Sequence, residues 1–470
     1  MYRGRNAEIR QKDKRECSSY FCTGATHHNL YKYQGYIMSV ISGPKGTRDF
    51  FPDDMAFQQH IFSIWHKTCK RYGFEFYDGP MFESLELYTR KSGDEIEKQL
   101  YTFEDKGQRL MALRPEMTPT LARMVASKGN NLKRPIRWYS IPRLFRYERM
   151  QKGRLREFFQ LNMDILGVKD VSADAELIAA VIDMMRDMQF DSNDFSVRIS
   201  SRTLLEGLFI NAGVPEEKLS QLYNLLDKKH KITAEEFSNE LSNCITDQAQ
   251  KEIIEKILDL KTLEQVAAIN PDIPALKDLQ TLFSLLNSYG LAGYTSFDIG
   301  IVRGLAYYTG IVFEVFDKMR SMRAIAGGGR YDRLVGKYGG QDTPAVGFAA
   351  GDVVLGELFK QKFNSNDLPR RCDVFVVSFD NSNIGKTIET ACAIRNSGIS
   401  CEFSLKPTSV GKQMEQAHAA GSIIAVFIGG EEEKEGKTKL KIMQTGEEFL
   451  IDAKLLVENI RKMTCPVPPG

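Results

Sequence analysis

The sequence predicts an α+β fold: an antiparallel-sheet domain that carries a helical insertion, followed by a small α/β domain. β-rich segments at 136–147 and 158–167 flank a charged turn that contains glycine, which is typical of an antiparallel hairpin. Between about 200 and 290 the chain is rich in Leu, Lys and Glu, with helical periods and almost no strand pattern. Beyond residue 371, strand-like and helix-like segments alternate.

The chain is long enough for two or three domains, each with a core of its own. It has 470 residues, of which 42% are hydrophobic and 26% charged, as in an ordinary globular protein. Its 63 Lys and Arg residues nearly cancel its 61 Asp and Glu residues, so a nucleic-acid partner must be inferred from local patches of charge. No run approaches the roughly 18 apolar residues that a membrane span requires, and we expect no membrane association.

Residues 1–42 form a polar N-terminal extension with seven basic and three acidic residues and no sustained apolar period. A mitochondrial presequence would be basic, rich in serine and nearly free of acids, so Glu8, Asp13 and Glu16 count against one. We expect a disordered extension. A mitochondrial pool that depends on this segment stays an alternative, with Met38 as a second start that omits it.

Eight cysteines are scattered along the chain without a Cys-x-x-Cys pair. In a chain of this size the pattern indicates reduced thiols in a cytosol-like compartment, so we expect a cytoplasmic protein. The nearest approach to a metal pattern is Cys17 and Cys22 with His27 and His28. Their spacing differs from that of a zinc finger and the segment is polar, so no metal site is predicted.

The main domain is expected over residues 43–362. Apolar residues recur with a period of about 3.6 over 55–71, which predicts an amphipathic helix. Residues 74–77 predict a strand, and residues 173–188 predict a second helix.

The insertion at 200–290 lies inside this main domain, and glycine-rich, strand-like segments return over 294–351. Residues 360–371 are the best linker candidate because they combine Asn, Ser, Pro and Arg. The second domain is expected over 371–470. Its predicted strands, at 374–379, 401–405 and 423–428, are separated by predicted helices.

The densest functional pattern lies between Asn131 and Glu157, where nine Lys or Arg residues accompany two Glu, a local net charge of +7. Such a run can be a solvated face. Here Arg146-Tyr147-Glu148 ends one β-rich segment, Arg154 lies in the turn, and Phe158 opens the return strand. Arginines on facing strands can converge on phosphate oxygens, a carboxylate can accept from an adenine amino group, and an aromatic ring offers a stacking face. These residues predict an antiparallel nucleotide site, and the sequence contains no P-loop.

The run Phe145-Arg146-Tyr147-Glu148, with its loop and Phe158-Phe159-Gln160-Leu161, resembles the second signature motif of class II aminoacyl-tRNA synthetases. The resemblance implies that Arg146 binds the α-phosphate and the amino-acid carboxylate and that Glu148 binds adenine. Arg154 and Phe158 match ATP-binding positions.

Three further runs narrow the resemblance to the histidyl-tRNA synthetases. They are Leu113-Arg114-Pro115-Glu116-Met117-Thr118, Arg303-Gly304-Leu305-Ala306-Tyr307-Tyr308-Thr309-Gly310 and Ala326-Gly327-Gly328-Gly329-Arg330-Tyr331-Asp332. Taken singly, each has a structural interpretation: a helix start, strand residues on alternate faces, and a tight turn. Together they follow the order of the family, and the resemblance extends from Gly43 to the C-terminus.

This resemblance implies a histidine–tRNA ligase with a class II catalytic domain and a C-terminal anticodon-binding domain. Such an enzyme makes histidyl-adenylate from L-histidine and ATP, with Mg²⁺ on the phosphates, and transfers histidine to the 3′ end of histidine tRNA. Arg303 and Arg146 would be the catalytic residues. The histidine-binding residues would be Glu116, Met117, Thr118, Arg146, Gln160, Asp164, Arg303, Tyr307, Tyr308 and Tyr331, and the ATP-binding residues Arg146, Glu148, Arg154, Phe158 and Arg303.

Three positions depart from the pattern of the family. The third class II motif usually ends in an arginine that contacts ATP, and Val354 stands at that position here, with Arg330 and Arg333 as candidates to replace it. Asp164 stands where many members have Glu. Met117 replaces a common glycine.

Two other functions stay open at this point. The missing arginine of the third motif favours a non-catalytic, synthetase-like regulator that senses histidine or uncharged tRNA, and a third candidate is a class II enzyme for another small amino acid. Arg303 could also be a structural ion-pair partner of Asp298 or Glu314, which are near it in sequence.

The resemblance also implies partners. Arg149 and Gln151 match positions that meet the extra 5′ nucleotide of histidine tRNA. The helix at 55–71 and the strand that follows it match the first class II motif, which builds a two-fold interface, so we expect a homodimer.

Overall fold

The computed structural model describes residues 31–33, 36–38, 41–90, 99–149, 151, 153–229, 232–303, 305, 307–319, 322–362, 372–380 and 384–464. The chain divides into two units, Met1–Lys45 and Gly46–Gly470. In the first unit, strands β1 (Tyr31–Tyr33) and β2 (Tyr36–Met38) pair antiparallel, an element that the sequence analysis did not predict. Cys17, Cys22, His27 and His28 lie outside the described residues.

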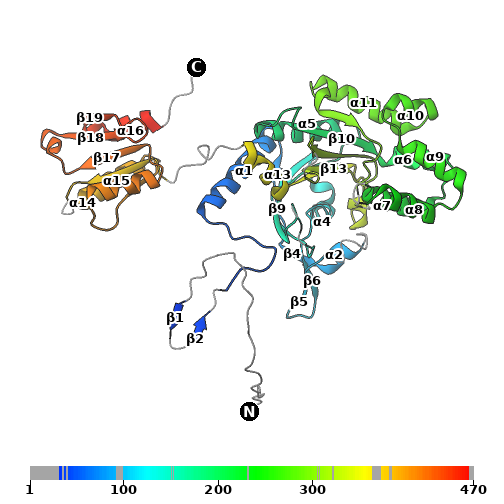
Figure 1. The fold of residues 1–470 in the computed structure, drawn as a ribbon, viewed down its shortest axis with the longest axis horizontal. Coiled ribbons are helices and arrows are strands. Elements are labelled where there is room, and N and C mark those ends of the chain that lie inside the picture. The colour runs from blue at the N-terminus through cyan, green and yellow to red at the C-terminus, as the bar shows by residue number, and fades with distance from the viewer. Residues whose placement is uncertain are drawn as a thin grey trace, which may run out of the picture. The chain divides into compact units, whose positions relative to one another are not determined.

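Among the described residues, nine strands form the central sheet of the second unit, in the order β11-β10-β12-β13-β14-β9-β7-β3, with β8 also paired to β9 (Figure 1). The neighbours from β10 to β7 run antiparallel, and the outer pairs β10–β11 and β3–β7 run parallel. The strands are β3 (Glu75–Phe76), β7 (Ile136–Ser140), β8 (Arg143–Phe145), β9 (Glu157–Leu166), β10 (Phe195–Ser201), β11 (Thr295–Phe297), β12 (Ile311–Asp317), β13 (Ala326–Arg330) and β14 (Ala345–Gly351).

The predicted hairpin is confirmed, with one difference. Its first arm is two strands, β7 and β8, and both pair with β9. Pro142 lies between them, and a proline cannot donate to a strand ladder, which explains the break in the first arm.

One face of the sheet is covered by α1 (Pro52–Arg71), α5 (Ser172–Asp187) and α13 (Asp352–Lys362). α1 begins with a proline and carries Asp53 and Asp54 in its first turn and Arg71 in its last, an arrangement that suits the helix dipole. Side chains of α5 such as Leu177 and Ile178 are fully buried and form the large core together with alternate residues of β9. The two helices predicted at 55–71 and 173–188 are therefore confirmed.

The opposite face of the sheet packs on α4 (Thr118–Lys128) and the short helix α12 (Leu334–Lys337) through a second core. Near α4, strands β4 (Phe82–Ser84), β6 (Leu110–Leu113) and β5 (Thr102–Glu104) form a separate three-stranded sheet, which the sequence analysis missed. The helix α2 (Leu85–Thr89) continues from β4. Because side chains alternate along β9, Gln160, Asn162 and Asp164 face this second side, where the functional cavity lies.

The insertion is helical, as predicted, and the described residues between β10 and β11 contain no strand. The helices are α6 (Arg202–Asn211), α7 (Glu216–Lys228), α8 (Ala234–Cys244), α9 (Gln248–Leu258), α10 (Leu263–Ile269) and α11 (Pro274–Ser288). Thr233 and Thr262 form capping boxes with Glu236 and Gln265, which fix the starts of α8 and α10.

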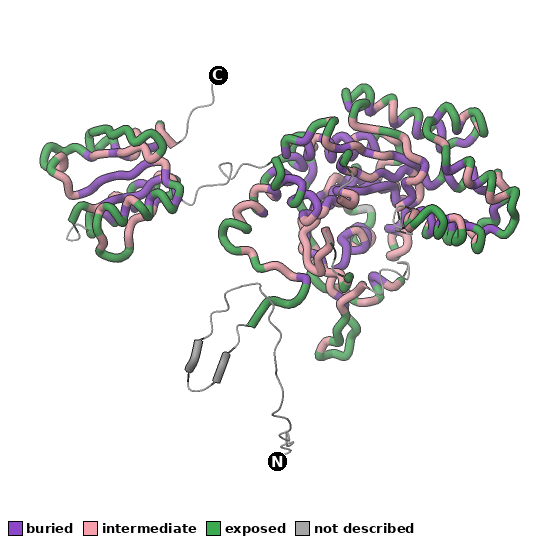
Figure 2. The backbone as a smooth tube through the Cα atoms, in the orientation of Figure 1, coloured by how far each residue is buried: buried purple, intermediate pink, exposed green. Residues whose placement is uncertain are grey.

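The C-terminal part forms a five-stranded sheet, in the order β16-β15-β17-β18-β19. The predicted alternation is confirmed as β15 (Val374–Ser378), α14 (Ile384–Asn396), β16 (Cys401–Phe403), α15 (Val410–Ala419) and β17 (Ile424–Ile428), with the three strands parallel. β18 (Lys437–Ile442), β19 (Glu448–Asp452) and α16 (Leu456–Thr464) complete it and were not predicted. Buried residues follow the inner strands and exposed ones the outer surfaces of the helices (Figure 2).

Within the described ranges, no helix is both long and apolar enough to cross a membrane.

Candidate functional site

A cavity of about 730 Å³ opens on the second face of the central sheet. Every residue predicted to bind histidine or ATP lines it, except Met117. The lining residues among them are Glu116, Thr118, Arg146, Glu148, Arg154, Phe158, Gln160, Asp164, Arg303, Tyr307, Tyr308 and Tyr331. Met117 instead lies fully buried in the second core. Neither of the residues predicted to contact tRNA, Arg149 and Gln151, lines the cavity; both side chains are exposed.

Four of the buried polar residues of the cavity, Glu116, Asp164, Tyr307 and Tyr331, are called the buried cluster below. Tyr307 donates to Oε2 of Glu116 at 2.8 Å, and none of the described residues donates to the other carboxylate oxygen, Oε1. Burial raises the pKa of Glu116, and the positive charge of Arg146 opposes that shift. A buried carboxylate oxygen without a donor suits a cationic group such as an ammonium, because an unpaired buried charge is costly.

Asp164 is the second carboxylate of this cluster, and it accepts a hydrogen bond from the Tyr331 hydroxyl at 2.5 Å. Burial raises the pKa of Asp164 to about 7, so the group can titrate near neutral pH. On the neighbouring strand β14, Gly347 lies directly opposite, and a Cβ there would come 1.9 Å from Oδ1 of Asp164. Glycine at this position is therefore required for the carboxylate to occupy its place.

Arg303 combines an ion pair with a place in the cavity. Its Nη1 donates to Oε1 of Glu314 at 2.5 Å, so one of the two partners considered from the sequence is present, whereas Asp298 pairs with Arg198. Its backbone has φ +56°, a conformation that costs energy for a residue other than glycine. Burial by itself lowers the pKa of Arg303, but the charge of Glu314 outweighs it and the pKa is raised.

The guanidinium of Arg303 lies against the glycine-rich strand β13. A Cβ at Gly327 would come 2.3 Å from Nη1 of Arg303, so the strand must carry a glycine there. The three glycines of the run 326–332 lie in the strand β13, so the tight turn considered for them is wrong.

Three residues predicted to bind the nucleotide, Glu148, Arg154 and Phe158, form a second group together with Arg323, which is called the half-buried cluster. Arg154 pairs with Glu148 at 2.6 Å, so the carboxylate predicted to bind adenine is engaged by a cation. Between the two clusters, Arg146 donates to the Pro115 carbonyl at 2.9 Å, and its guanidinium lies 5.3 Å from the ring centroid of Phe158.

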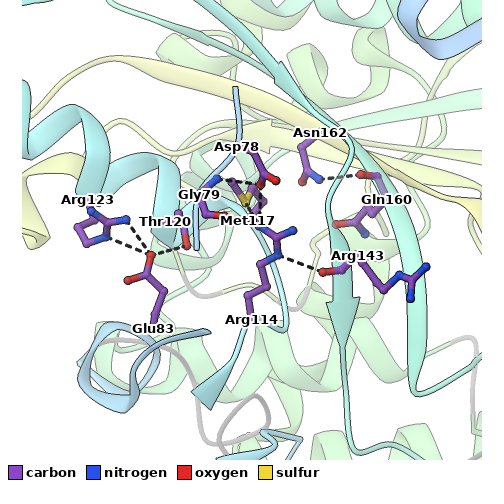
Figure 3. Close-up of polar contacts among 10 residues, drawn as sticks. All are labelled: Asp78, Gly79, Glu83, Arg114, Met117, Thr120, Arg123, Arg143, Gln160 and Asn162. Carbon is purple, nitrogen blue, oxygen red and sulfur yellow. Dashed lines mark hydrogen bonds and ion pairs between the residues drawn. The ribbon is translucent and has the colours of Figure 1, made fainter. Parts of the chain in front are cut away.

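The Arg-Pro-Glu run is held in place by Arg114, a residue that sequence reasoning left without a role (Figure 3). This buried arginine pairs with Asp78 at 2.6 Å and donates to the carbonyls of Gly79 at 2.9 Å and Arg143 at 3.0 Å. It thus ties β8 to the segment before β4, and it fixes the backbone from which Glu116 enters the cavity.

The two candidates to replace an arginine at position 354 do not line the cavity. Arg330 is buried and pairs with Asp174 of α5, on the other face of the sheet, and it also donates to the carbonyl of Asp170 at 2.8 Å. Arg333 is exposed at the start of α12. Val354 itself does line the cavity.

Sequence reasoning missed other lining residues, namely Asn162, Arg198, Asp227, Glu314, Phe316, Met322 and Arg323. Asn162 could have been found, since it alternates with Gln160 and Asp164 on β9. Asp227 belongs to α7 of the insertion, and Arg323 precedes β13; neither carries a sequence signal that places it here.

A buried acid, arginines and tyrosines beside a half-buried arginine and aromatic cluster, all lining one cavity on an antiparallel sheet, define the site of a class II aminoacyl-tRNA synthetase. A family model described as histidyl-tRNA synthetase matches residues 46–352, and one described as an anticodon-binding domain matches residues 373–463. The chain therefore belongs to the histidyl-tRNA synthetase family. The resemblance noted from the sequence is confirmed.

Curated relatives named histidine–tRNA ligase match most of the length of this chain. The chain is 39% identical over 413 residues to a chloroplastic/mitochondrial histidine–tRNA ligase of Arabidopsis thaliana, covering 87% of this chain and 85% of that one. It is 40% identical over 418 residues to the histidine–tRNA ligase of Opitutus terrae, covering 87% and 96%. The histidyl-tRNA synthetase structure from Nostoc sp. PCC 7120 shares the fold, with a TM-score of 0.77 at 24% identity over 90% of this chain and all of that one. These two relatives give no support to the regulator alternative.

Proposed function

We propose that this chain activates L-histidine with ATP in the cavity and transfers the histidyl group to the 3′ end of histidine tRNA. One observation carries the proposal: the buried carboxylate of Glu116, with an oxygen that no described residue satisfies, shares a cavity with Arg146 and Arg303. An α-amino acid has an ammonium for that acid and a carboxylate for those arginines.

The buried cluster suits the imidazole ring. Asp164 can accept a ring N–H, and Tyr331, Tyr308 and Gln160 supply further polar atoms around it. Such a site rejects a shape-matched competitor that lacks ring nitrogens, because its own buried polar groups would then lose their partners.

Adenylate formation needs no nucleophile from the protein. A carboxylate oxygen of histidine attacks the α-phosphorus, the bond to the bridging oxygen breaks, and pyrophosphate leaves. Arg303 and Arg146 stabilise the charge that develops there, and such preorganised charge is worth a few kcal/mol of barrier. The tRNA hydroxyl then attacks the histidyl carbonyl, and AMP leaves.

The nucleotide would occupy the half-buried cluster. Phe158 offers a face for adenine, Arg154 a charge for the phosphates, and Glu148 can accept from the adenine amino group once Arg154 turns to the phosphates. Mg²⁺ usually binds through one or two carboxylates plus phosphate oxygens. Glu314 would supply such a carboxylate, and the described residues contain no group of three or more metal-ligating side chains. When bound, the ion would neutralise charge on the leaving phosphates.

We propose further that the protein is a homodimer. Large apolar side chains are exposed on the edge strand β3 and on the three-stranded sheet, namely Phe76, Phe82, Phe103 and Leu110. The rings of Phe82 and Phe103 lie 5.8 Å apart and form one patch, and such patches mark contact surfaces. Sedimentation that shows a monomer at micromolar concentration would contradict this.

Histidine tRNA is the proposed macromolecular partner. Arg149 and Gln151, exposed beside the cavity mouth, would meet its 5′ end, and the C-terminal α/β part would bind its anticodon. We propose a cytoplasmic location, with a mitochondrial pool if translation starts at Met1 rather than Met38. Fluorescent fusions of the two forms separate these outcomes.

Histidine-dependent ATP–pyrophosphate exchange tests the central proposal. We expect exchange with histidine and with no other amino acid, and charging of histidine tRNA. A regulator would bind histidine without exchange, and an enzyme for another amino acid would exchange with that one instead.

A further inference from the structure

Arg323 is a cationic residue of the cavity to which neither the family motifs nor the proposed mechanism gives a role. It precedes β13 and lines the same cavity as Glu148, Arg154 and Val354. Its Nη2 donates to Oε1 of Gln151 at 2.8 Å, so its head group reaches across to the loop between β8 and β9.

The other arginines of the cavity have carboxylates close by. Arg303 pairs with Glu314, Arg198 with Asp298, and Arg154 with Glu148. Arg146 faces Glu116, whose pKa its charge affects. Arg323 enters none of the ion pairs formed among the described residues, and its partner there is a neutral amide.

The guanidinium groups of Arg154 and Arg323 therefore share the cavity with the carboxylate of Glu148, which, among the described residues, forms an ion pair with Arg154 alone. Gln151, which accepts from Arg323, forms a β-bridge with Arg154, so the two cations lie near each other. Burial and the positive charge of Arg154 lower the pKa of Arg323, and the charge of Glu148 opposes this shift. An anion that both can reach relieves this repulsion. Phosphate oxygens are the anions that arginine forks bind best.

We propose that Arg323 binds the terminal phosphates of ATP, and the pyrophosphate that leaves, from the β13 side of the cavity. The inference rests on the proposed function, because it names a further contact of the same substrate. Val354 lies against the same loop, since a Cβ at Gly153 would come 3.1 Å from its Cγ2, and its side chain carries no charge. Arg323 supplies the cation that position 354 lacks.

The arrangement of the cavity indicates which phosphates of ATP Arg323 would contact. The α-phosphate must lie where the histidine carboxylate can attack it, beside Arg146 and Arg303 and near Glu116. In an in-line displacement the leaving group departs on the side opposite the attacking oxygen. Arg323 belongs to the half-buried cluster and not to the buried cluster that would hold the amino acid, so it would meet the leaving end of the phosphate chain.

The test compares nucleotides that have and lack those phosphates. Histidine-dependent pyrophosphate exchange is measured against ATP and pyrophosphate concentration for the full-length wild type, Arg323→Ala, Arg323→Gln and Arg323→Lys, together with inhibition by AMP. Arg333→Ala is the matched control, because it removes an exposed arginine that does not line the cavity. Thermal unfolding of every variant is recorded, and Arg323→Gln retains an amide that can donate to Gln151.

Arg323→Ala and Arg323→Gln should raise the KM for ATP and for pyrophosphate roughly 10- to 100-fold, the loss expected for hydrogen bonds to a charged group. AMP inhibition and Tm should not change, Arg323→Lys should fall between, and Arg333→Ala should match the wild type. Equal weakening of AMP and ATP, or an unchanged KM for ATP, overturns the assignment. So does normal exchange with impaired tRNA charging, which would make Arg323 a tRNA contact. A wild type without exchange refutes the proposed function itself, which is a separate result.

Discussion

The polar side chains of the buried cluster hold one another in place, whereas those of the half-buried cluster come largely from a loop, and only Glu148 and Arg154 pair with each other. Asp164 is fixed by Tyr331 and by the absence of a side chain at Gly347, and Glu116 by Tyr307. Glu148 and Arg154, in contrast, neutralise each other and must separate to bind a nucleotide. The first cluster is built for selectivity among amino acids, and the second for a highly charged ligand that reorganises it.

Arg303 lines the cavity that both clusters share, and its substitution should have the largest effect. Arg303→Ala should lower kcat for pyrophosphate exchange by two to three orders of magnitude, roughly 3–4 kcal/mol, with only modestly weaker histidine binding. Lysine should not restore the rate fully, because an ammonium cannot form the bidentate fork.

The ion pair with Glu314 makes a structural role the competing explanation. If the role is structural, Arg303→Ala and Glu314→Gln would each lower Tm and the active fraction together. We expect the same of Arg71→Ala, which breaks the ion pair between α1 and Asp187 of α5 on the other face of the sheet. Near-normal exchange in Arg303→Ala would remove the residue from the mechanism.

The buried cluster predicts a pH dependence of stability that runs against that of most carboxylates. The pKa of Asp164 is about 7 in the folded protein, above the usual 3.8. Between these values the folded state holds a proton that the unfolded state has lost, so stability from this group falls as pH rises toward 7. Relative to the wild type, Asp164→Asn should therefore gain stability between pH 5 and pH 8, on the order of 3 kcal/mol.

Urea unfolding of both proteins at the two pH values measures this difference, and the comparison cancels groups that titrate in both. Asp105→Asn is the control: Asp105 is half-buried outside the cavity, and its pKa is lowered by hydrogen bonds from Arg109, so its effect lies at lower pH. A difference independent of pH would show that Asp164 stays ionised in the fold.

Glu116→Gln should damage histidine binding and spare the nucleotide. The amide keeps the shape of the carboxylate but loses its charge, and we expect the KM for histidine to rise roughly 10- to 100-fold, the loss typical of a hydrogen bond to a charged group. The KM for ATP should stay near that of the wild type. The measurement is pyrophosphate exchange as a function of histidine and of ATP concentration, with Glu176→Gln as a control outside the cavity. A parallel rise in the KM for histidine and the KM for ATP would show that the clusters are coupled.

The comparison also explains what the sequence could and could not predict. Glu116, Arg146 and Tyr307 each lie in a short run that can be recognised from the local sequence, so their location in one cavity was predicted. β18 and β19 were missed because exposed lysines and glutamates conceal their pattern, and only residues such as Leu440 are buried. Arg323 lines the cavity because of the way the segment before β13 folds, and no periodic pattern in the sequence predicts that position.

The smallest predicted effect concerns tRNA at the rim of the half-buried cluster. Arg149 is exposed and does not line the cavity, so Arg149→Ala should leave histidine-dependent exchange unchanged. If it contacts the extra 5′ nucleotide, charging of histidine tRNA should fall roughly tenfold in kcat/KM, toward the lower end of the range for an arginine fork on guanine, because the contact is open to solvent.

A tRNA without that nucleotide should already be charged slowly by the wild type, and it should lose little more in the variant. Arg333→Ala, equally exposed, should charge both tRNAs as the wild type does. Equal losses in exchange and charging would instead place Arg149 in adenylate formation. The assignment of tRNA contacts to the loop and of adenylate formation to the cavity would then be wrong.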